Sequence, residues 1–350
     1  MSLPQSAIVP VNLLSASFNN TSATYKFYWL LAVIEAVENG EQAIMKKDLF
    51  ARMISQAWFT VNYFHISFGK QDKLQRAIQV IKQTENINID EHREIIFNRI
   101  KLTTNPITLR ELKHFDSQVP HWFLSPWFPG SNRAAIYESS LTFTNQCIYQ
   151  LRHDQIFINP DWVVYILENA RIIKNFCYWN LVIFLQKKNP NVPDIPNKLI
   201  KPAFRSSLSQ QRNGFWNIVF DEVKTIKCIY TGEQLTKAAY AVEHFIPYSF
   251  VSHNLIWNLL PADPSFNCSK SNKLPNLEKH FDSFFNIQKQ AVEIVYRVSP
   301  NNKILEDYLT IFPDFGSTSS FTENFTPDKF KDRLQPLITI ASNNGFEYMK

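Results

Sequence analysis

Residues 228–275 have the sequence CIYTGEQLTKAAYAVEHFIPYSFVSHNLIWNLLPADPSFNCSKSNKLP, and this stretch is the most informative part of the chain. Within it, Val242–Ile246 predicts a β-strand that ends at Pro247. Asp263 followed by Pro264 is typical of a helix N-terminus, because aspartate caps the first turn and proline fits the first helical position. The stretch therefore predicts a strand pair, a turn-rich loop and a short helix.

Polar side chains stand at defined positions in these elements. Glu243 and His244 are neighbours on the strand, so regular strand geometry directs their side chains to opposite faces. We therefore expect a kink or bulge near Pro247 that turns one of them toward the other, as is common beside active sites. On the helix, Asn267 and Lys270 are three residues apart and share one face with Ser271.

These residue types suit phosphodiester hydrolysis. The reaction needs a base that takes a proton from water, and a cation that stabilises charge on the phosphate and the leaving oxygen. Imidazole serves as the base near neutral pH because its unperturbed pKa is about 6.5. Mg²⁺ serves as the cation and needs only one or two protein ligands, such as a carboxylate and an amide oxygen.

The segment resembles the HNH, or ββα-metal, nuclease family. The blocks CIYTGEQL, VEHFIPYSF, WNLL and SFNCSKSNKLP occur in the family's order, most like the HNH domains of type II CRISPR effectors. The resemblance implies that His244 is the general base and that Asn258 braces the loop and orients it. It further implies that Glu243 and Asn267 bind Mg²⁺ or Mn²⁺, and that Lys270 contacts a phosphate.

The segment departs from the family pattern at three points. Glu243 stands where aspartate is more usual, and Asn267 stands where many members have histidine. The CxxC pairs that bind zinc in many members are missing, so we expect no structural zinc. His253 and His280 are alternative metal ligands.

A basic stretch precedes the segment. Residues 195–220 contain no acidic residue, and their cations lie among aromatic side chains, which suits a phosphate backbone. The alternative is a basic connector whose aromatic residues belong to the core. The candidate nucleic-acid-binding residues are Lys198, Lys201, Arg205 and Arg212, together with Lys273 in the segment itself.

Composition limits the fold and the function. Of the 350 residues, 45% are hydrophobic, which is enough for a substantial buried core. Only seven are glycine, and none lies in a Walker or dinucleotide-binding pattern, so nucleotide-binding folds of those types are excluded. Few glycines also favour helices over turn-rich β folds. The predicted fold class is mainly α with a small α+β nuclease module, and the net charge of +5 suits a polyanionic partner such as DNA.

The chain is expected to divide into three regions. Residues 1–215 form a helical region, with helices expected near 27–37, 46–57, 71–84 and 162–185. A loop-rich, proline- and aromatic-rich connector at 104–130 is a candidate boundary between two helical subdomains. Residues 216–281 form the HNH module, and residues 282–350 form a C-terminal helical region with helices near 282–297 and from Pro327 onward.

Cellular location follows from the termini and cysteines. The N-terminus lacks the features of a signal peptide, and the longest apolar run, near 27–37, is too short to span a bilayer. The four cysteines have no paired spacing, so we expect free, mostly buried thiols. These features predict a cytoplasmic protein without a membrane segment.

The leading hypothesis is a metal-dependent HNH endonuclease acting on DNA, of restriction or anti-phage type. One alternative is a homing or mobile-element endonuclease. The other is a non-catalytic nucleic-acid-binding subunit with a relic HNH fold. The sequence leaves open whether the protein acts as a homodimer or with a partner protein of a defence system.

Overall fold

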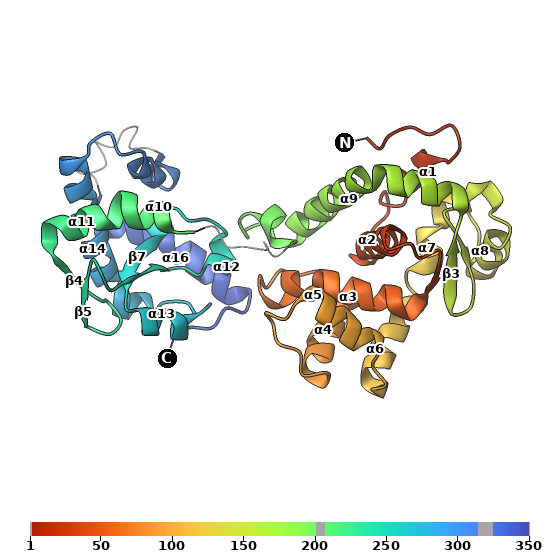
Figure 1. Ribbon diagram of the computed structural model, residues 1–350, viewed down its shortest axis with the longest axis horizontal. Helices are drawn as coiled ribbons and strands as arrows, with labels where there is room; N and C mark the ends of the chain where they lie inside the picture. Colours follow the sequence, from red (N-terminus) through yellow and green to blue (C-terminus); the bar gives the residue numbers. More distant parts are fainter. Residues whose placement is uncertain (1, 201–206, 314–324, 350) are drawn as a thin grey trace. The chain divides into compact units, whose positions relative to one another are not determined.

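The computed structural model describes residues 2–200, 207–313 and 325–349. The chain divides into two compact units, Met1–Pro190 with Ile195–Lys201 and Asn191–Asp194 with Pro202–Lys350 (Figure 1). Helices dominate both units, and the strands form small antiparallel sheets, so the predicted fold class is confirmed. Among the helices in the described ranges, none has the length and apolar character needed to cross a membrane.

The first unit is built from helices and one small sheet. Strand β3 (Gln155–Ile158) lies between β1 (Ala43–Met45) and β2 (Tyr149–Leu151), with both pairs antiparallel. The helices are α1 (Val11–Ala16), α2 (Tyr25–Glu38), α3 (Lys46–Asn62), α4 (Lys73–Thr84), α5 (Arg93–Lys101), α6 (Pro106–Asp116), α7 (Pro120–Phe123), α8 (Arg133–Ser140) and α9 (Pro160–Lys188), with short turns η1 (Ser125–Trp127), η2 (Thr144–Gln146) and η3 (Ile195–Lys198).

The expected helices of this unit are present, with one correction. Helices α2, α3, α4 and α9 cover the four predicted positions. The loop-rich interpretation of residues 104–130 is wrong, because α6, α7 and η1 lie there. Pro106 and Pro120 stand at the first turns of α6 and α7, where proline is tolerated because its missing N–H would have no helical partner.

Helix α2 lies at the centre of the first unit. Nearly all of its residues are buried, so it has no solvent-facing polar stripe. Its Trp29 donates a hydrogen bond to the Tyr149 hydroxyl (3.0 Å), which donates in turn to the Pro120 carbonyl (2.6 Å). This chain joins α2 to β2 and α7 while satisfying polar atoms inside the core.

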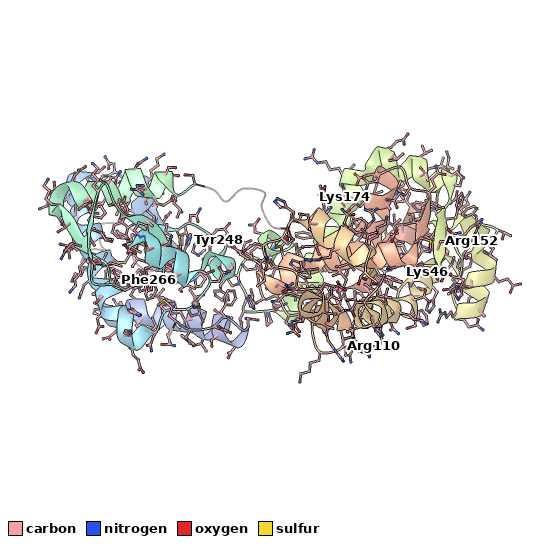
Figure 2. All side chains as sticks on the ribbon, turned by 60° about the horizontal axis from the view of Figure 1, so that its bottom comes forward. Lys46, Arg110, Arg152, Lys174, Tyr248 and Phe266 are labelled. Carbon is pink, nitrogen blue, oxygen red and sulfur yellow. The ribbon has the colours of Figure 1, made fainter. Side chains whose placement is uncertain are left out.

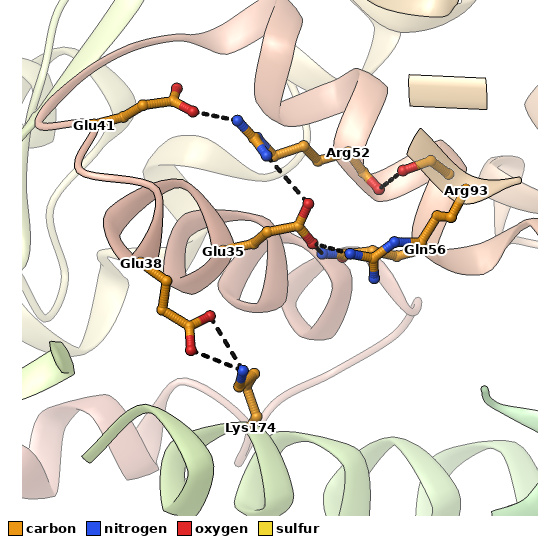
Figure 3. A network of polar contacts seen from close by, with 8 residues as sticks. Glu35, Glu38, Glu41, Arg52, Gln56, Arg93 and Lys174 are labelled. Carbon is orange, nitrogen blue, oxygen red and sulfur yellow. Dashed lines mark hydrogen bonds and ion pairs between the residues drawn. The ribbon is translucent and has the colours of Figure 1, made fainter. Parts of the chain in front are cut away.

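A charged network fastens the surrounding helices to α2 (Figure 3). Glu35 accepts from Arg52 of α3 (3.1 Å) and from Arg93 of α5 (2.8 Å). Arg52 also pairs with Glu41, and its side chain is almost completely buried. Lys174 of α9 pairs with Glu38 (2.9 Å). Because Arg52 is out of water, loss of its carboxylate partners would leave an uncompensated buried charge.

The second unit contains two hairpins and a helical layer. Strands β4 (Thr225–Lys227) and β5 (Gln234–Thr236) pair antiparallel, as do β6 (Ala241–His244) and β7 (Leu259–Ala262). The helices are α10 (Ser209–Gln211), the π-helical turn η4 (Arg212–Trp216), α11 (Asn217–Val223), α12 (Tyr248–Val251), η5 (Ile256–Asn258), α13 (Pro264–Lys270), α14 (Leu277–Val298), η6 (Lys303–Thr310) and α16 (Pro327–Asn343).

Helix α14 supports the β6–β7 hairpin. Its Phe284 stacks on Phe245, with ring centroids 3.9 Å apart and ring planes 1° from parallel. Its Gln288 donates to the Leu259 carbonyl (2.6 Å) and accepts from the Tyr308 hydroxyl. These contacts hold the start of β7 against α14. The expected helices near 282–297 and from Pro327 are present as α14 and α16.

Candidate active site

Strand β6 carries the Glu243-His244 pair. Its four residues pair one-to-one with β7, with Glu243 opposite Leu260 and His244 opposite Leu259. The expected bulge is therefore not within the paired residues. Glu243 is buried and His244 is half-buried, as the alternation of a regular strand requires.

Glu243 meets a cation and a hydroxyl in the interior. Its Oε1 accepts from the Lys270 ammonium (2.5 Å), and its Oε2 accepts from the Tyr230 hydroxyl (3.0 Å). Burial raises the pKa of Glu243, while the Lys270 ammonium and the Tyr230 hydroxyl act in the opposite direction. Only 3% of the Glu243 side chain and 1% of the Lys270 side chain are exposed, so this is an ion pair of the protein interior.

Lys270 joins helix α13 to strand β6. Besides Glu243, its ammonium donates to the carbonyls of His244 (2.7 Å) and Phe245 (3.2 Å). An ammonium has three N–H donors, so these contacts use its full capacity. The structure thus gives Lys270 a role in holding strand and helix together, in place of the phosphate contact that the resemblance implied.

Asn258 clamps the chain just after His244. Its Oδ1 accepts from the Ile246 amide and its Nδ2 donates to the Ile246 carbonyl, both at 2.8 Å. Its own carbonyl accepts from the Phe245 amide (2.8 Å), and its side chain is fully buried. These hydrogen bonds hold the backbone of Phe245 and Ile246, the two residues that follow His244.

The His244 ring has a different polar partner. Its Nε2 lies 3.0 Å from Oδ1 of Asn254, and its ring meets Tyr248 edge to face with centroids 5.5 Å apart. Tyr248 is labelled in Figure 2. The sequence pattern did not single out Asn254 or Tyr230 as residues of the site. The only signal for them in the sequence was their position close to the motif, since functional residues often lie on loops.

Asn267 lies on α13, which begins as predicted. Asp263 caps this helix by accepting from the Phe266 amide (2.8 Å), and Pro264 occupies its first turn. Asn267 is half-buried and lies three residues before Lys270, so the two side chains share one side of the helix.

The donors fit a hard divalent cation. Glu243 and Asn267 offer carboxylate and amide oxygens, and Mg²⁺ completes its shell with waters. A carboxylate has about four acceptor positions, so Glu243 retains lone pairs beyond the two hydrogen bonds that it accepts. Within the described ranges, no group of three or more His, Cys, Asp or Glu side chains could hold a metal. An ion at this site would therefore depend on the Glu243 carboxylate and an amide.

The two alternative histidine ligands have other contacts. His253 Nδ1 accepts from the Leu255 amide (3.4 Å), and its ring lies 5.0 Å from that of Trp257. His280 is buried with its ring edge against Tyr230, at a centroid distance of 5.2 Å.

Ring stacking and a cysteine contact join the loop between β4 and β5 to helix α13. Tyr230 stacks on Phe266 with centroids 4.6 Å apart and planes at 16°. Phe266 is labelled in Figure 2. The Cys228 sulfur accepts from the Asp263 amide (3.5 Å). All four cysteines are free thiols, and Cys268 is exposed while the others are buried, as expected.

The described candidate nucleic-acid-binding residues differ in their surroundings. Lys198 is fully buried, so it does not present its charge to a nucleic acid in this structure. Arg212 donates to the Tyr240 carbonyl (2.9 Å) and lies 4.1 Å from the centre of the Tyr240 ring, so it is engaged inside its unit. Lys273 is exposed. Lys201 and Arg205 lie outside the described residues.

Comparison with known proteins identifies the segment. Residues 228–276 match the family model described as HNH endonuclease. No curated protein and no solved structure matches the chain. The match does not distinguish the type II CRISPR effectors from the rest of the family. It indicates nuclease activity on nucleic acid, in a family whose members generally use divalent metal ions.

Proposed function

Because residues 228–276 form an HNH-family module, we propose that the protein is a metal-dependent endonuclease that hydrolyses phosphodiester bonds in DNA. The observation that carries the proposal is the arrangement around β6. There, a half-buried histidine follows a buried carboxylate, and an asparagine clamps the backbone that follows both.

Each residue has a distinct role in this proposal. His244 takes a proton from the attacking water, and Asn258 holds the backbone after it so that the imidazole keeps its place. Glu243 and Asn267 would hold Mg²⁺ or Mn²⁺. When bound, this ion would stabilise negative charge on the phosphate and the leaving oxygen. Lys270 keeps the carboxylate and the strand against α13.

The test is a nicking assay on supercoiled plasmid, with Mg²⁺ or Mn²⁺ and with EDTA. We expect metal-dependent relaxation that falls by about 10²–10⁴-fold in His244→Ala, because this is the usual contribution of a positioned general base. DNA binding by His244→Ala should remain. His153→Ala, which changes a histidine whose side chain is 94% exposed, serves as the control and should keep its activity. Equal nicking by the native chain and His244→Ala would contradict the proposal.

A second candidate is a nucleic-acid-binding module without catalysis. The Glu243–Lys270 pair favours it, because an ammonium already neutralises the carboxylate that would meet the metal. Calorimetric titration with Mn²⁺ separates the two candidates. Binding that is lost in Glu243→Gln supports the nuclease, whereas no binding together with no cutting supports the binding module.

The biological part of the proposal is a restriction or anti-phage role. It rests on the combination of a nuclease module with a separate helical unit large enough to recognise another molecule. Plating efficiency of phage on cells that carry the native chain or His244→Ala tests it. Equal plating on both strains would speak against a defence role that depends on cleavage.

A further inference from the structure

A pocket of about 240 Å³ lies between α13 and the first turn of α14. The stacked rings of Tyr230 and Phe266 line it, and Ser269 adds a hydroxyl. Lys270 also lines this pocket and contacts Glu243, so the pocket adjoins the proposed metal ligand. Typical pockets for small organic ligands measure about 300–1,000 Å³, so this pocket suits a smaller group.

The lining of the pocket is cationic. Lys273 and Lys279 are exposed, and none of the described residues that line the pocket with them carries a carboxylate. In the part of the chain that the structure describes, neither lysine forms an ion pair. The charge of Lys270, in contrast, is balanced by Glu243. Among the described residues, two positive charges at the pocket therefore have no ion-pair partner.

Two further features support an anionic occupant. The pocket lies at the N-terminus of α14, where the helix dipole is positive. His280, which also lines it, has its pKa lowered by burial and by the nearby Lys279 and Lys270 ammonium groups. Burial is the larger cause of this lowered pKa, and the two ammonium groups add to it. The ring stays neutral near pH 7, so it offers a hydrogen bond without a charge.

We propose that this pocket binds a backbone phosphate of the nucleic-acid strand through Lys273 and Lys279, and so holds the strand beside Glu243 and His244. The inference rests on the proposed function and names the substrate contact for the same site. It gives Lys273 and Lys279 the phosphate-binding role that Lys270, with all its donors engaged, does not fill.

The test measures DNA binding in the His244→Ala background with EDTA, so that no strand is cut. Fluorescence anisotropy with a short labelled duplex gives the dissociation constant between about 50 and 200 mM salt. We expect Lys273→Gln and Lys279→Gln each to weaken binding. Each should lower the slope of log K against log salt by about one, because each lost phosphate contact releases one counterion fewer.

Lys289→Gln is the matched control, since Lys289 is exposed on α14 but does not line the pocket. Its slope should equal that of the parent. Unchanged slopes in both pocket variants would overturn the proposal. Calorimetry with inorganic phosphate tests whether the pocket binds a free phosphate ion instead of a strand. Phosphate binding that the variants abolish, with DNA binding unchanged, would make this a small-anion site and overturn the strand assignment.

Nicking by the native chain keeps the two proposals separate. If the native chain nicks DNA but the salt slopes of the pocket variants are unchanged, only the pocket proposal is contradicted, because cleavage would proceed without these lysines. If the slopes are reduced but no metal supports nicking, only the proposed nuclease function is contradicted, because the pocket would still bind a strand.

Discussion

Lys270 satisfies a buried carboxylate and two backbone carbonyls at once, and this allows a charged side chain to lie inside the module. An ion pair taken out of water is stable only when its remaining donors and acceptors are also satisfied. Tyr230 completes this requirement from the other side of Glu243. The cluster therefore stabilises the folded site as well as placing its reactive groups.

Lys270→Met tests this view at the residue scale. The change leaves the Glu243 carboxylate buried without its cation, so we expect the second unit to lose about 3–5 kcal/mol of its unfolding free energy. Urea denaturation measures the loss. The double variant Lys270→Met with Glu243→Gln removes the orphaned charge and should recover much of it. A double variant no more stable than Lys270→Met would contradict the assignment of the loss to that charge.

The residues of the site were partly predictable from sequence. The order of Glu243, His244, Asn258 and Asn267 sufficed to locate the module that the family match identifies. The partners were not predictable, because Tyr230 reaches Glu243 across thirteen residues of chain and Lys270 reaches it across 27. Sequence spacing carries no information about such contacts until the hairpin and helix are placed together.

Among the elements, short helix α7 carries an unusual histidine. His121 is only 3% exposed, and its Nδ1 has no hydrogen-bond partner in the described part of the chain. Burial lowers the pKa of His121 to about 4, with Arg133 and Lys46 contributing in the same direction and Asp116 opposing them. The folded first unit therefore holds this imidazole in its neutral form.

This predicts a pH-dependent loss of stability. An unfolded histidine titrates near pKa 6.5, so between about pH 6.5 and pH 4 the unfolded chain binds a proton that the folded chain does not. The stabilisation is complete above that range and falls as the pH falls. We expect a loss of about 2 kcal/mol between pH 7 and pH 5, measured by urea denaturation.

His121→Gln removes the titrating group and should show a smaller loss over the same range. His153→Gln is the control, because the His153 side chain is 94% exposed. It should keep the pH dependence of the parent. Identical pH dependence in the parent and His121→Gln would rule out this histidine as the cause.

Prediction of the elements from sequence succeeded where apolar periodicity was long and failed where proline dominated. Helices α2, α3 and α9 bury enough apolar residues at helical spacing to be recognised. Helix α6 was taken for a connector because its prolines and aromatics suggested loop. Asn105 caps that helix and Pro106 begins it, which is a start signal for a helix rather than a break.

For the whole molecule, the two units each have a core of their own. We therefore expect two unfolding transitions, since a chain with separate cores does not behave as one cooperative system. Lys270→Met should shift one transition, and Arg52→Met, which leaves Glu35 and Glu41 without their shared cation, should shift the other. Differential scanning calorimetry of the two variants measures this. One transition moved by both variants would contradict it.

The contact between His244 and Asn254 fixes which tautomer the imidazole adopts. An amide oxygen only accepts hydrogen bonds, so the ring nitrogen 3.0 Å from it, Nε2, carries the hydrogen. The lone pair of the neutral ring then lies on Nδ1. Asn254, ten positions after His244, thus determines which ring nitrogen accepts a proton, before any substrate binds.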